Sequence, residues 1–367
     1  MEKEYCVLAI NPGSTSTKIA VFVNEVCETE VVIRHSKEDL LPYQRPDRDV
    51  MGQKEMRRRL VEQALAEKQI PLERLDAVVG RAGRLPPMPG GTYQVTEDLL
   101  QDVPHPLVHP ALLGALIAKD LGDALGIPSF FVDPTVVDEL SDIARITGIP
   151  EISRGVIFHA LNHKAVARRY AAEHGTRYED TNLIIAHMGG GISIAAHKNG
   201  LAVDVTNASN GEGPMSPERA GMVPGIPLVD LCFSGNYTHQ EMRRFFTQRG
   251  GLNAYLGHSD FRKCSEGWAE GKQPEKNLFE AMAYQVSKHI CSMAAILDGK
   301  VDAVILTGGL AYSKDFIKLI EQRVRFLGDV VVYPGEDELL SLAQGALRVL
   351  RGEEEARRYV CRGAIEE

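Results

Sequence analysis

The chain has 367 residues, of which 44% are apolar and 25% charged, and its formal net charge is −9 at pH 7. This length suits two domains, each with enough apolar surface for a core of its own, and the negative charge disfavours nonspecific binding to nucleic acid. The apolar stretches are short and the N-terminus is charged, so the sequence predicts neither a membrane span nor a secretion signal. The six cysteines lack metal-site spacing, which indicates a reduced, cytoplasmic protein.

The predicted elements begin with a strand, a glycine turn and two more strands, and the same order returns later in the chain. In the first half the strands are 5–10, 17–23 and 26–34, with the turn at 12–16. In the second half an apolar run at 183–186 precedes glycines at 189–191, and strands at 192–197 and 201–206 form a hairpin. Such an internal duplication predicts two similar domains that face each other.

Helices and further strands alternate between these segments. Helical periodicity is found at 54–69, 110–125 and 279–297, and strands are expected at 77–79, 129–132, 303–306 and 330–333. This order predicts mixed sheets with right-handed crossovers and flanking helices. We expect the first domain at 1–150 and the second at 151–339, with a C-terminal helix at 340–367 that returns to the first. The basic run at 57–59 is expected on a solvated helix face.

Three turns rich in glycine, serine or threonine each follow an apolar strand, at 11–18, 187–191 and 307–310. Backbone N–H groups are accessible in such turns, so phosphate oxygens can approach closely and accept hydrogen bonds from several directions. One turn alone is equally well explained as a hairpin. Three of them, in two repeated halves, predict a polyphosphate site, and the sequence has neither a P-loop motif nor a dinucleotide GxGxxG motif.

Six segments resemble the acetate and butyrate kinase family, in the family's order and across nearly the whole chain. They are VLAINPGSTSTK at 7–18, FVD at 131–133, Phe158-His159 with His163, HMGGG at 187–191, MSPERAG at 215–221 and LTGG at 306–309. The resemblance implies an α/β fold of two duplicated ribonuclease H-like (actin-like ATPase) domains, with mixed sheets flanked by helices and a cleft between the domains. It also implies ATP-dependent phosphorylation of a short-chain carboxylate with Mg²⁺, in a homodimer or larger homo-oligomer, with no nucleic-acid or membrane partner.

The resemblance assigns catalytic roles to four residues. Arg81 and Arg219 would hold the carboxylate and the transferred phosphoryl group, since a guanidinium forms two-point contacts with oxyanions. His159 would hydrogen-bond the phosphoryl oxygens, and Asp133 would orient an arginine or assist the metal. A carboxylate is already ionised at neutral pH, so the reaction needs no general base and depends on positioning and on cations. Without the resemblance, both arginines would be interpreted as surface residues and Asp133 as a turn cap.

Other residues are assigned to the metal and the nucleotide by the same resemblance. Mg²⁺ is expected near Asn11 and Glu338, bound through water, although Glu336 and Asp337 remain open as alternatives to Glu338. The residues expected to bind the phosphates or the adenosine are Asn11, Gly13, Ser14, Ser16, Lys18, His187, Gly189, Gly190, Gly191, Asp260, Phe261, Arg262, Gly308 and Gly309. Phe261 is equally consistent with a place in the core.

The segment at 80–84, with PGGTY at 89–93, resembles butyrate kinases more than acetate kinases. Acetate kinases have bulkier valines where this chain has Ala82 and Gly83, and the resemblance places both residues, with Phe158, in the acyl pocket. The smaller side chains would leave room for a longer or branched acyl chain, whose burial contributes roughly 0.8 kcal/mol per CH₂. Butyrate is therefore the expected substrate, with acetate, propionate and isobutyrate as alternatives.

Several alternatives remain open. His159 and His163 are four residues apart on a predicted helix, but the glutamate of the zinc motif HExxH is missing. The roles of His105, His109 and His163 are undetermined. A kinase of the same superfamily with a hydroxyl acceptor would need a general base. An actin-like or chaperone-like ATPase would need a partner-binding module, for which the chain has little room.

Overall fold

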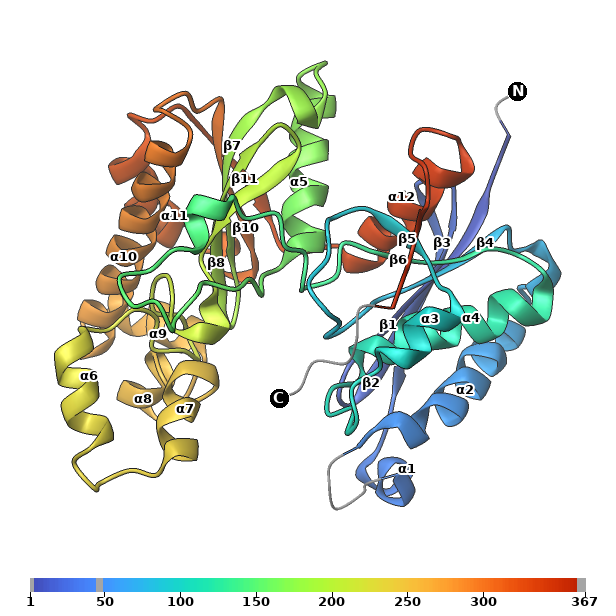
Figure 1. The fold of residues 1–367 in the computed structure, drawn as a ribbon, viewed down its shortest axis with the longest axis horizontal. Helices are drawn as coiled ribbons and strands as arrows, with labels where there is room; N and C mark the ends of the chain where they lie inside the picture. The colour runs from blue at the N-terminus through green and yellow to red at the C-terminus, as the bar shows by residue number, and fades with distance from the viewer. Residues whose placement is uncertain (1–2, 44–48, 362–367) are drawn as a thin grey trace. The chain divides into compact units, whose positions relative to one another are not determined.

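The computed structural model describes residues 3–43 and 49–361 of the chain (Figure 1). The chain forms two compact units. Unit 1 contains residues 1–137 and 337–367, and unit 2 contains residues 138–336. In the described residues, no helix has both the length and the apolar character needed to cross a membrane.

Unit 1 is built on a mixed seven-stranded sheet with the order β12-β5-β6-β4-β1-β2-β3. Its strands are β1 (Cys6–Pro12), β2 (Ser16–Val23), β3 (Val26–Arg34), β4 (Ala77–Gly80), β5 (Thr92–Gln94), β6 (Ser129–Val132) and β12 (Arg357–Arg358). Strand β1 pairs antiparallel with β2 and parallel with β4. Every residue of β1 is buried, which accounts for the apolar run at residues 6–10, because both faces of a central strand must be covered.

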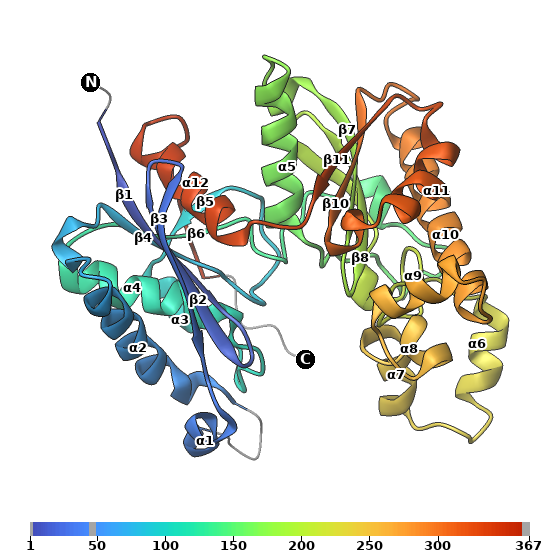
Figure 2. The ribbon, with the colours of Figure 1, turned by 180° about the vertical axis from the view of Figure 1, so that it is seen from behind.

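Helices cover both faces of this sheet. They are α1 (Lys37–Leu40), α2 (Lys54–Glu67), α3 (Glu97–Gln101), α4 (Leu113–Leu125) and α12 (Glu338–Leu350). Helices α4 and α12 both contact β1, β4 and β6, and α2 contacts α4. Figure 2 shows α2 and α4 on one side of the strands and α12 on the other. The last segment of the chain thus completes the core of unit 1.

Unit 2 repeats the strand pairing of unit 1. Its five-stranded sheet has the order β11-β10-β7-β8-β9. The strands are β7 (Asn182–Met188), β8 (Ile192–Lys198), β9 (Leu201–Val205), β10 (Ala303–Gly308) and β11 (Asp329–Pro334). Strand β7 pairs antiparallel with β8 and parallel with β10, as β1 pairs with β2 and β4. The internal repeat seen in the sequence therefore corresponds to a repeated sheet.

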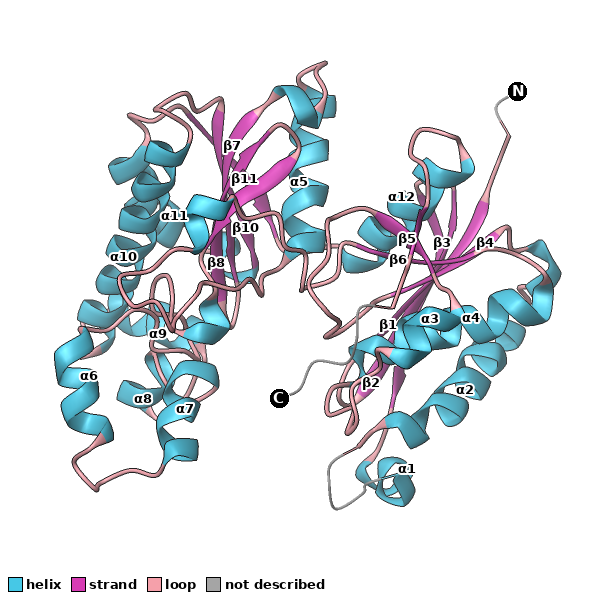
Figure 3. Ribbon diagram, in the orientation of Figure 1, coloured by secondary structure: helices cyan, strands magenta, loops and turns pink. Residues whose placement is uncertain are grey.

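The helices of unit 2 include α5 on one side of its strands and α10 and α11 on the other (Figure 3). They are α5 (Ala160–Glu173), α6 (Gly225–Cys232), α7 (His239–Thr247), α8 (Leu252–Leu256), α9 (Phe261–Ala269), α10 (Glu275–Ile296) and α11 (Lys314–Val324). Alternate residues of β7 point to opposite faces, so Ile184 packs in the cluster of α10 and α11, whereas Leu183 and Ile185 pack with α5.

The limits of the two units differ from the expected domain limits. Residues 138–150 were expected in the first domain but belong to unit 2. Two contacts explain this placement: Ser141 N donates to Val203 O over 3.1 Å, and Lys164 forms an ion pair of 2.9 Å with Glu139. The helix expected from residue 110 begins as a 3₁₀ turn, Pro110–Leu112, before α4.

The prediction of a solvated basic face at 57–59 is wrong for Arg57, which is 0% exposed. Its guanidinium donates to Gln53 Oε1, to the carbonyl oxygen of Ser16 and to Thr17 Oγ1. A buried arginine needs such partners, because a charge without hydrogen bonds is unstable away from water. Arg57 therefore stabilises the turn between β1 and β2 through hydrogen bonds to Ser16 and Thr17.

Candidate active site

The first glycine turn joins β1 to β2 in unit 1. Gly13 N donates to the carbonyl oxygen of Ser16 over 2.7 Å, which closes the turn, and Ser14 at its tip is exposed. Arg57 donates to the same Ser16 oxygen over 3.0 Å and to Thr17 Oγ1 over 2.8 Å. The turn is thus closed by its own backbone and held by a buried cation, so its shape is fixed before any ligand binds.

Asn11, Arg81 and Glu338 meet at the end of β1. Arg81 directly follows β4, and its guanidinium forms an ion pair with the carboxylate of Glu338, the first residue of α12. Asn11 Nδ2 donates to the same carboxylate. The structure therefore brings together three of the predicted residues, and Lys18 lies opposite Asn11 in the strand pair with an exposed side chain.

Of the three neighbouring acids, Glu338 is the one that contacts Asn11 and Arg81. Asp337 caps α12 by accepting from Leu340 N, and Glu336 lies in unit 2, 3.7 Å from His187 Nε2. The metal role of Glu338, like that of the two alternatives, stays a prediction.

Asn11 and Glu338 together offer oxygen ligands, the type that Mg²⁺ prefers. Among the described residues, no group of three or more His, Cys, Asp or Glu side chains is placed to hold a metal ion. A pair of protein oxygens fits Mg²⁺, which keeps several waters and takes further ligands from substrate phosphates.

Close packing between β4 and α4 fixes the backbone at Arg81. Its N donates to Ile10 O over 2.9 Å, and its carbonyl oxygen accepts from Ala115 N over 3.0 Å. A Cβ added to Gly114 would lie 2.7 Å from the N and the O of Arg81, so this approach requires glycine. The backbone from which the Arg81 side chain extends is therefore rigid.

The residues expected in the acyl pocket lie in different units. Ala82 belongs to the core of unit 1, and a Cβ added to Gly83 would lie 3.1 Å from Leu112 N at the start of α4. Phe158 is in unit 2, where its ring packs edge-on against His163 with 5.1 Å between the ring centres. Phe158 therefore helps to hold His163, and the acyl-pocket role of all three stays a prediction.

Asp133 follows β6 and is buried. Its Oδ1 accepts from Gly91 N over 2.7 Å, and its own N donates to Gly91 O over 3.1 Å. The carboxylate thus fixes the PGGTY segment beside β6. The predicted role of Asp133 with an arginine or the metal stays a prediction.

His109 caps the 3₁₀ turn before α4, where its Nδ1 accepts from Ala111 N over 3.2 Å. Partial loss of water contact lowers the pKa of His109, and the charges of Arg81 and Arg84 lower it further. The imidazole is therefore neutral at pH 7 and adds no positive charge beside Arg81.

The second glycine turn, between β7 and β8 in unit 2, contacts Arg219. A Cβ added to Gly191 would lie 2.8 Å from Cζ of Arg219, so the guanidinium rests directly on the glycine. Burial lowers the pKa of Arg219, and the neighbouring Glu218 acts in the opposite direction. In the described part of the chain, Arg219 Nε is buried and has no hydrogen-bond partner, which leaves a donor for a ligand.

The segment that carries Arg219 is fastened to this turn. Ser216 Oγ donates to Gly190 O over 2.7 Å and accepts from Arg219 N over 3.1 Å, while Glu218 N donates to Gly190 O over 3.3 Å. The MSPERAG motif is thus a clamp that sets the guanidinium on the glycine turn.

The third glycine turn lies beside the second, because β10 is the parallel neighbour of β7. Gly308 has a φ of 87°, and a Cβ there would lie 2.7 Å from Met188 N, so glycine is required on both grounds. Gly309 follows, next to the carboxyl end of β7. The carboxyl ends of neighbouring parallel strands are a common place for ligands in α/β sheets.

The structure gives Asp260, Phe261 and Arg262 distinct local roles. Asp260 caps α9 by accepting from Arg262 N and Lys263 N over 3.0 and 3.3 Å. The ring of Phe261 packs against Phe279 and Phe316, with centre distances of 5.5 and 5.1 Å. Phe261 is thus partly a core residue, and contact of this segment with adenosine stays a prediction.

His159 lies immediately before α5 and not within it, which corrects the expected helix. Its ring stacks on that of His187 at 3.9 Å between ring centres, and its Nδ1 lies 3.0 Å from Ser193 Oγ. His187 Nδ1 lies 2.8 Å from Asn162 Oδ1. His159, His187 and the second glycine turn are therefore neighbours, whereas Ser193 and Asn162 were missed by the sequence analysis.

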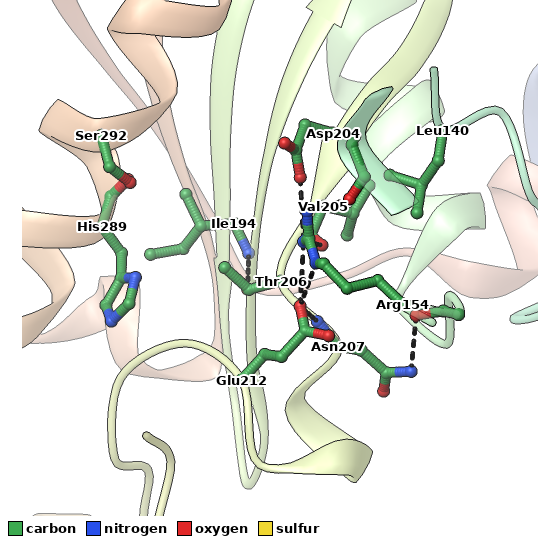
Figure 4. A network of polar contacts seen from close by, with 12 residues as sticks. Leu140, Arg154, Ile194, Asp204, Val205, Thr206, Asn207, Glu212, His289 and Ser292 are labelled. Atoms are coloured by element: carbon green, nitrogen blue, oxygen red, sulfur yellow. Dashed lines mark hydrogen bonds and ion pairs between the residues drawn. The ribbon is translucent and has the colours of Figure 1, made fainter. Parts of the chain in front are cut away.

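A separate network, also missed, surrounds Arg154 (Figure 4). Arg154 donates to Glu212 over 2.9 Å and to Val205 O over 2.8 Å, and it forms an ion pair of 2.9 Å with Asp204. Burial opposes its charge, but the carboxylates of Glu212 and Asp204 more than offset this and raise the pKa of Arg154. The network fixes the segment before α5 to the end of β9.

Comparisons with known proteins agree with this arrangement. A model described as the Acetokinase family matches residues 152–342. "Butyrate kinase 2" from Clostridium acetobutylicum is 49% identical over 97% of this chain and 99% of its own length. This chain belongs to the acetokinase family. A "Probable butyrate kinase" from Clostridium botulinum is 47% identical, over 97% of this chain and 99% of its own length.

The crystal structure of an acetate kinase from Porphyromonas gingivalis has the acetokinase fold with a TM-score of 0.74 at 20% identity, over 94% of this chain and 100% of that one. The predicted family and the predicted α/β fold with two mixed sheets are both confirmed. Membership of the acetokinase family makes this chain a kinase whose acceptor is a carboxyl group.

Proposed function

We propose that the chain is a butyrate kinase, which transfers the γ-phosphoryl group of ATP to butyrate and reversibly forms butanoyl phosphate and ADP. The similarity to butyrate kinases at 49% and 47% identity, over nearly the full length, carries this proposal. The small residues Ala82 and Gly83 support it, since they leave more room than valines for an acyl chain.

In this proposal the protein acts by positioning and by charge. Butyrate is ionised at neutral pH and attacks the γ-phosphorus directly, so no residue removes a proton. Arg219, a cation in a partly buried place, binds the transferred group, and the low local polarity strengthens its attraction to phosphate. Arg81, whose partner Glu338 is itself an anion, exchanges this partner for a substrate anion.

We assign the nucleotide phosphates to the three glycine turns and Mg²⁺ to Asn11 and Glu338. When bound, the metal neutralises phosphate charge. Glu338 is suited to this role because its carboxylate accepts from Asn11 Nδ2, which orients it at the end of β1.

Acyl phosphate formation, trapped as the hydroxamate, tests the proposal. With a series of carboxylates and ATP, we expect the highest kcat/KM for butyrate or isobutyrate and lower values for propionate and acetate. Phosphorylation of only a sugar or glycerol would contradict it, and so would slow ATP hydrolysis that no carboxylate stimulates.

The acyl preference has a direct test in Ala82→Val. The added methyl groups reduce the space beside Gly83, so kcat/KM for butyrate is expected to fall by roughly four- to fifteenfold relative to acetate, about one or two CH₂ groups of burial. Thermal melting of the variant checks that the core of unit 1, to which Ala82 belongs, still folds. An unchanged ratio would remove Ala82 from the acyl pocket.

We also propose that a second copy of the chain covers one apolar face of unit 2. Large apolar side chains are exposed along two segments of this unit: Ile143, Ile146, Ile149, Ile152, Met222, Ile226, Val229 and Phe233. Ile152 and Met222 line one hollow of about 480 Å³ together with Met293 and Ile296, so the two segments share a surface. Exposed apolar faces of this kind favour association.

Light scattering coupled to size exclusion tests the second copy. The parent is expected to be a homodimer or larger, and Ile226→Glu is expected to shift it towards the monomer. Val26→Glu, at an equally exposed position in unit 1, is the matched control. A monomeric parent would contradict the proposal.

ATP as substrate and six unpaired cysteines favour the cytoplasm as the place of the reaction.

A further inference from the structure

A continuous chain of hydrogen-bonding side chains runs through unit 2 and ends at His159. The Oη of Tyr178 lies 2.6 Å from His197 Nδ1, and His197 Nε2 lies 3.2 Å from His163 Nδ1. Ser193 Oγ then lies 3.0 Å from His163 Nε2 and 3.0 Å from His159 Nδ1. Tyr178, His197, His163 and Ser193 are all buried.

The two inner histidines are neutral. Burial lowers the pKa of His163 and of His197 well below the ordinary value, and nearby charged or titratable groups act in the same direction. For His163 these groups are other histidines, and for His197 they are Lys164 and Arg168. A neutral imidazole has one N–H and one lone pair, so each ring must donate on one side and accept on the other. The hydrogen bonds of this series can therefore run in only two directions, from Tyr178 towards His159 or from His159 towards Tyr178.

The hydrogen bond between Tyr178 and His197 decides between these two directions. A phenol is a better donor than acceptor, and an imidazole nitrogen is a better acceptor than a phenol oxygen. Two cations also lie near the Tyr178 ring, with Lys164 Nζ at 5.6 Å and Arg168 Cζ at 5.9 Å from its centre. They stabilise the negative charge that builds up on a donating phenol oxygen. Tyr178 therefore donates to His197 Nδ1, and each later member donates to the next.

We propose that Tyr178, His197, His163 and Ser193 are positioning residues that keep the proton of His159 on Nε2. In the direction set by the phenol, the Ser193 hydroxyl donates to His159 Nδ1, so this nitrogen has no proton and the ring carries its proton on Nε2. This inference rests on the proposed function, because His159 then donates from Nε2 to the oxygens of the transferred phosphoryl group. The opposite direction would present a lone pair, which repels those oxygens.

The surroundings of His159 fix the ring as well as the proton. Its plane lies 15° from that of His187, at 3.9 Å between ring centres, and His187 is held in turn by Asn162. Ring orientation and tautomer are thus set by different neighbours. A wrong tautomer alone is known to reduce catalysis strongly in enzymes that depend on an oriented histidine.

Nitrogen-15 NMR of the histidine-labelled full chain tests the tautomer directly. Long-range proton–nitrogen correlations distinguish a protonated ring nitrogen from a bare one, and loss of a signal in His159→Gln assigns that residue. We expect Nε2 of His159 to be protonated and Nδ1 to be bare in the parent. A proton on Nδ1 would overturn the proposal, whatever the substrate of the enzyme is.

Kinetics of Tyr178→Phe test the consequence. Without the phenol donor both directions are populated, so kcat is expected to fall on the order of tenfold while KM for butyrate and ATP stays within about twofold. Tyr170→Phe removes a hydroxyl from the same apolar cluster, outside the chain of hydrogen bonds, and should keep the parent kcat. An unchanged kcat in Tyr178→Phe, with an unchanged His159 tautomer, would contradict the proposal.

Ser193 supplies a second variant at the other end. Ser193→Ala breaks the chain beside His159 and should lower kcat, whereas Ser193→Thr keeps the hydroxyl and should restore most of it. Equal loss in both variants would point to packing and against positioning. If the parent phosphorylates no carboxylate, the proposed function fails, and the NMR experiment still decides the tautomer.

Discussion

Arg219 shows how burial and backbone shape prepare one charge for an anion. Its guanidinium lies against Gly191, and its backbone N donates to Ser216 Oγ. In the described structure, its Nε is buried and has no hydrogen-bond partner. A charge in such surroundings interacts more strongly than one in water, because fewer water dipoles screen it. The same features make the site sensitive to any change of the side chain.

Arg219→Ala is therefore expected to lower kcat on the order of 10²- to 10³-fold, as loss of a preorganised donor does in other enzymes. Arg219→Lys keeps the charge but loses the two-point contact, so it should recover only part of the activity. Hydroxamate-coupled kinetics provide the measurement. Arg323→Ala, on the exposed surface of α11, is the matched control. Parent-like turnover in Arg219→Ala would exclude Arg219 from the reaction.

Among single residues, Asn11 and Glu338 are in contact, as their shared metal assignment implied, and Arg219 lies on the second glycine turn. Their roles in binding and catalysis stay predictions. Arg57 was misjudged because its burial depends on Thr17 and Ser16, which are distant in the chain. The sequence pattern could also have indicated the hydrogen-bonded series of Ser193 and the histidines, because residues 193, 195 and 197 share one face of a strand.

At the scale of elements, α4 approaches β4 so closely that glycine is needed where they touch. A Cβ at Gly114 would lie 2.7 Å from backbone atoms of Arg81 and 3.0 Å from Ile10 O. The position of α4 thus determines the position of Arg81. The sequence predicted both elements but not this contact, since the distance between a helix and a strand depends on packing.

Gly114→Ala is expected to destabilise the protein by about 1–3 kcal/mol, as overpacking does, and to lower kcat by moving Arg81. Thermal unfolding and steady-state kinetics measure the two effects. In Gly148→Ala the added Cβ meets no atom within 4 Å, so both quantities should stay near those of the parent. A Gly114→Ala variant with parent stability would show that α4 can shift without loss.

The β1–β2 turn rests on a buried histidine as well as on Arg57. Thr17 Oγ1 lies 2.9 Å from His35 Nε2 and accepts from Arg57 over 2.8 Å. The pKa of His35 is lowered to about 4, mainly by burial and also by the charge of Arg57, while Asp39 acts in the opposite direction. The folded protein therefore holds His35 neutral under conditions in which the unfolded chain would protonate it.

Stability should consequently fall on acidification. Because the folded pKa of about 4 lies below the unfolded value of 6.5, the unfolded state binds more protons between these values. The contribution of His35 is complete above pH 6.5 and is lost as the pH falls towards 4, about 2 kcal/mol between pH 7 and pH 5. Urea unfolding at both pH values should show a pH dependence smaller by this amount in His35→Gln. An equal dependence in both proteins would contradict the assignment.

At the scale of the whole molecule, each unit has a core of its own. One large cluster consists of unit 1 residues, and two others, on opposite faces of the second sheet, consist of unit 2 residues. The sequence predicted the duplication from its repeated strand and turn order. The sequence did not predict the division between Val137 and Asp138. The segment after Val137 is held in unit 2 by the Lys164–Glu139 ion pair, and no local sequence pattern reveals this contact.

Two core substitutions test whether the units are independently stable. Leu342, fully buried on α12, belongs to unit 1, and Phe279, fully buried on α10, belongs to unit 2. Leu342→Ala should destabilise unit 1 by about 2–5 kcal/mol, and Phe279→Ala should destabilise unit 2 by about 3–5 kcal/mol. Hydrogen exchange measured by mass spectrometry should then show faster exchange in β1 and β4 for the first variant, and in β7 and β10 for the second. Each variant serves as the control for the other, and faster exchange in all four strands for both variants would show a single cooperative unit.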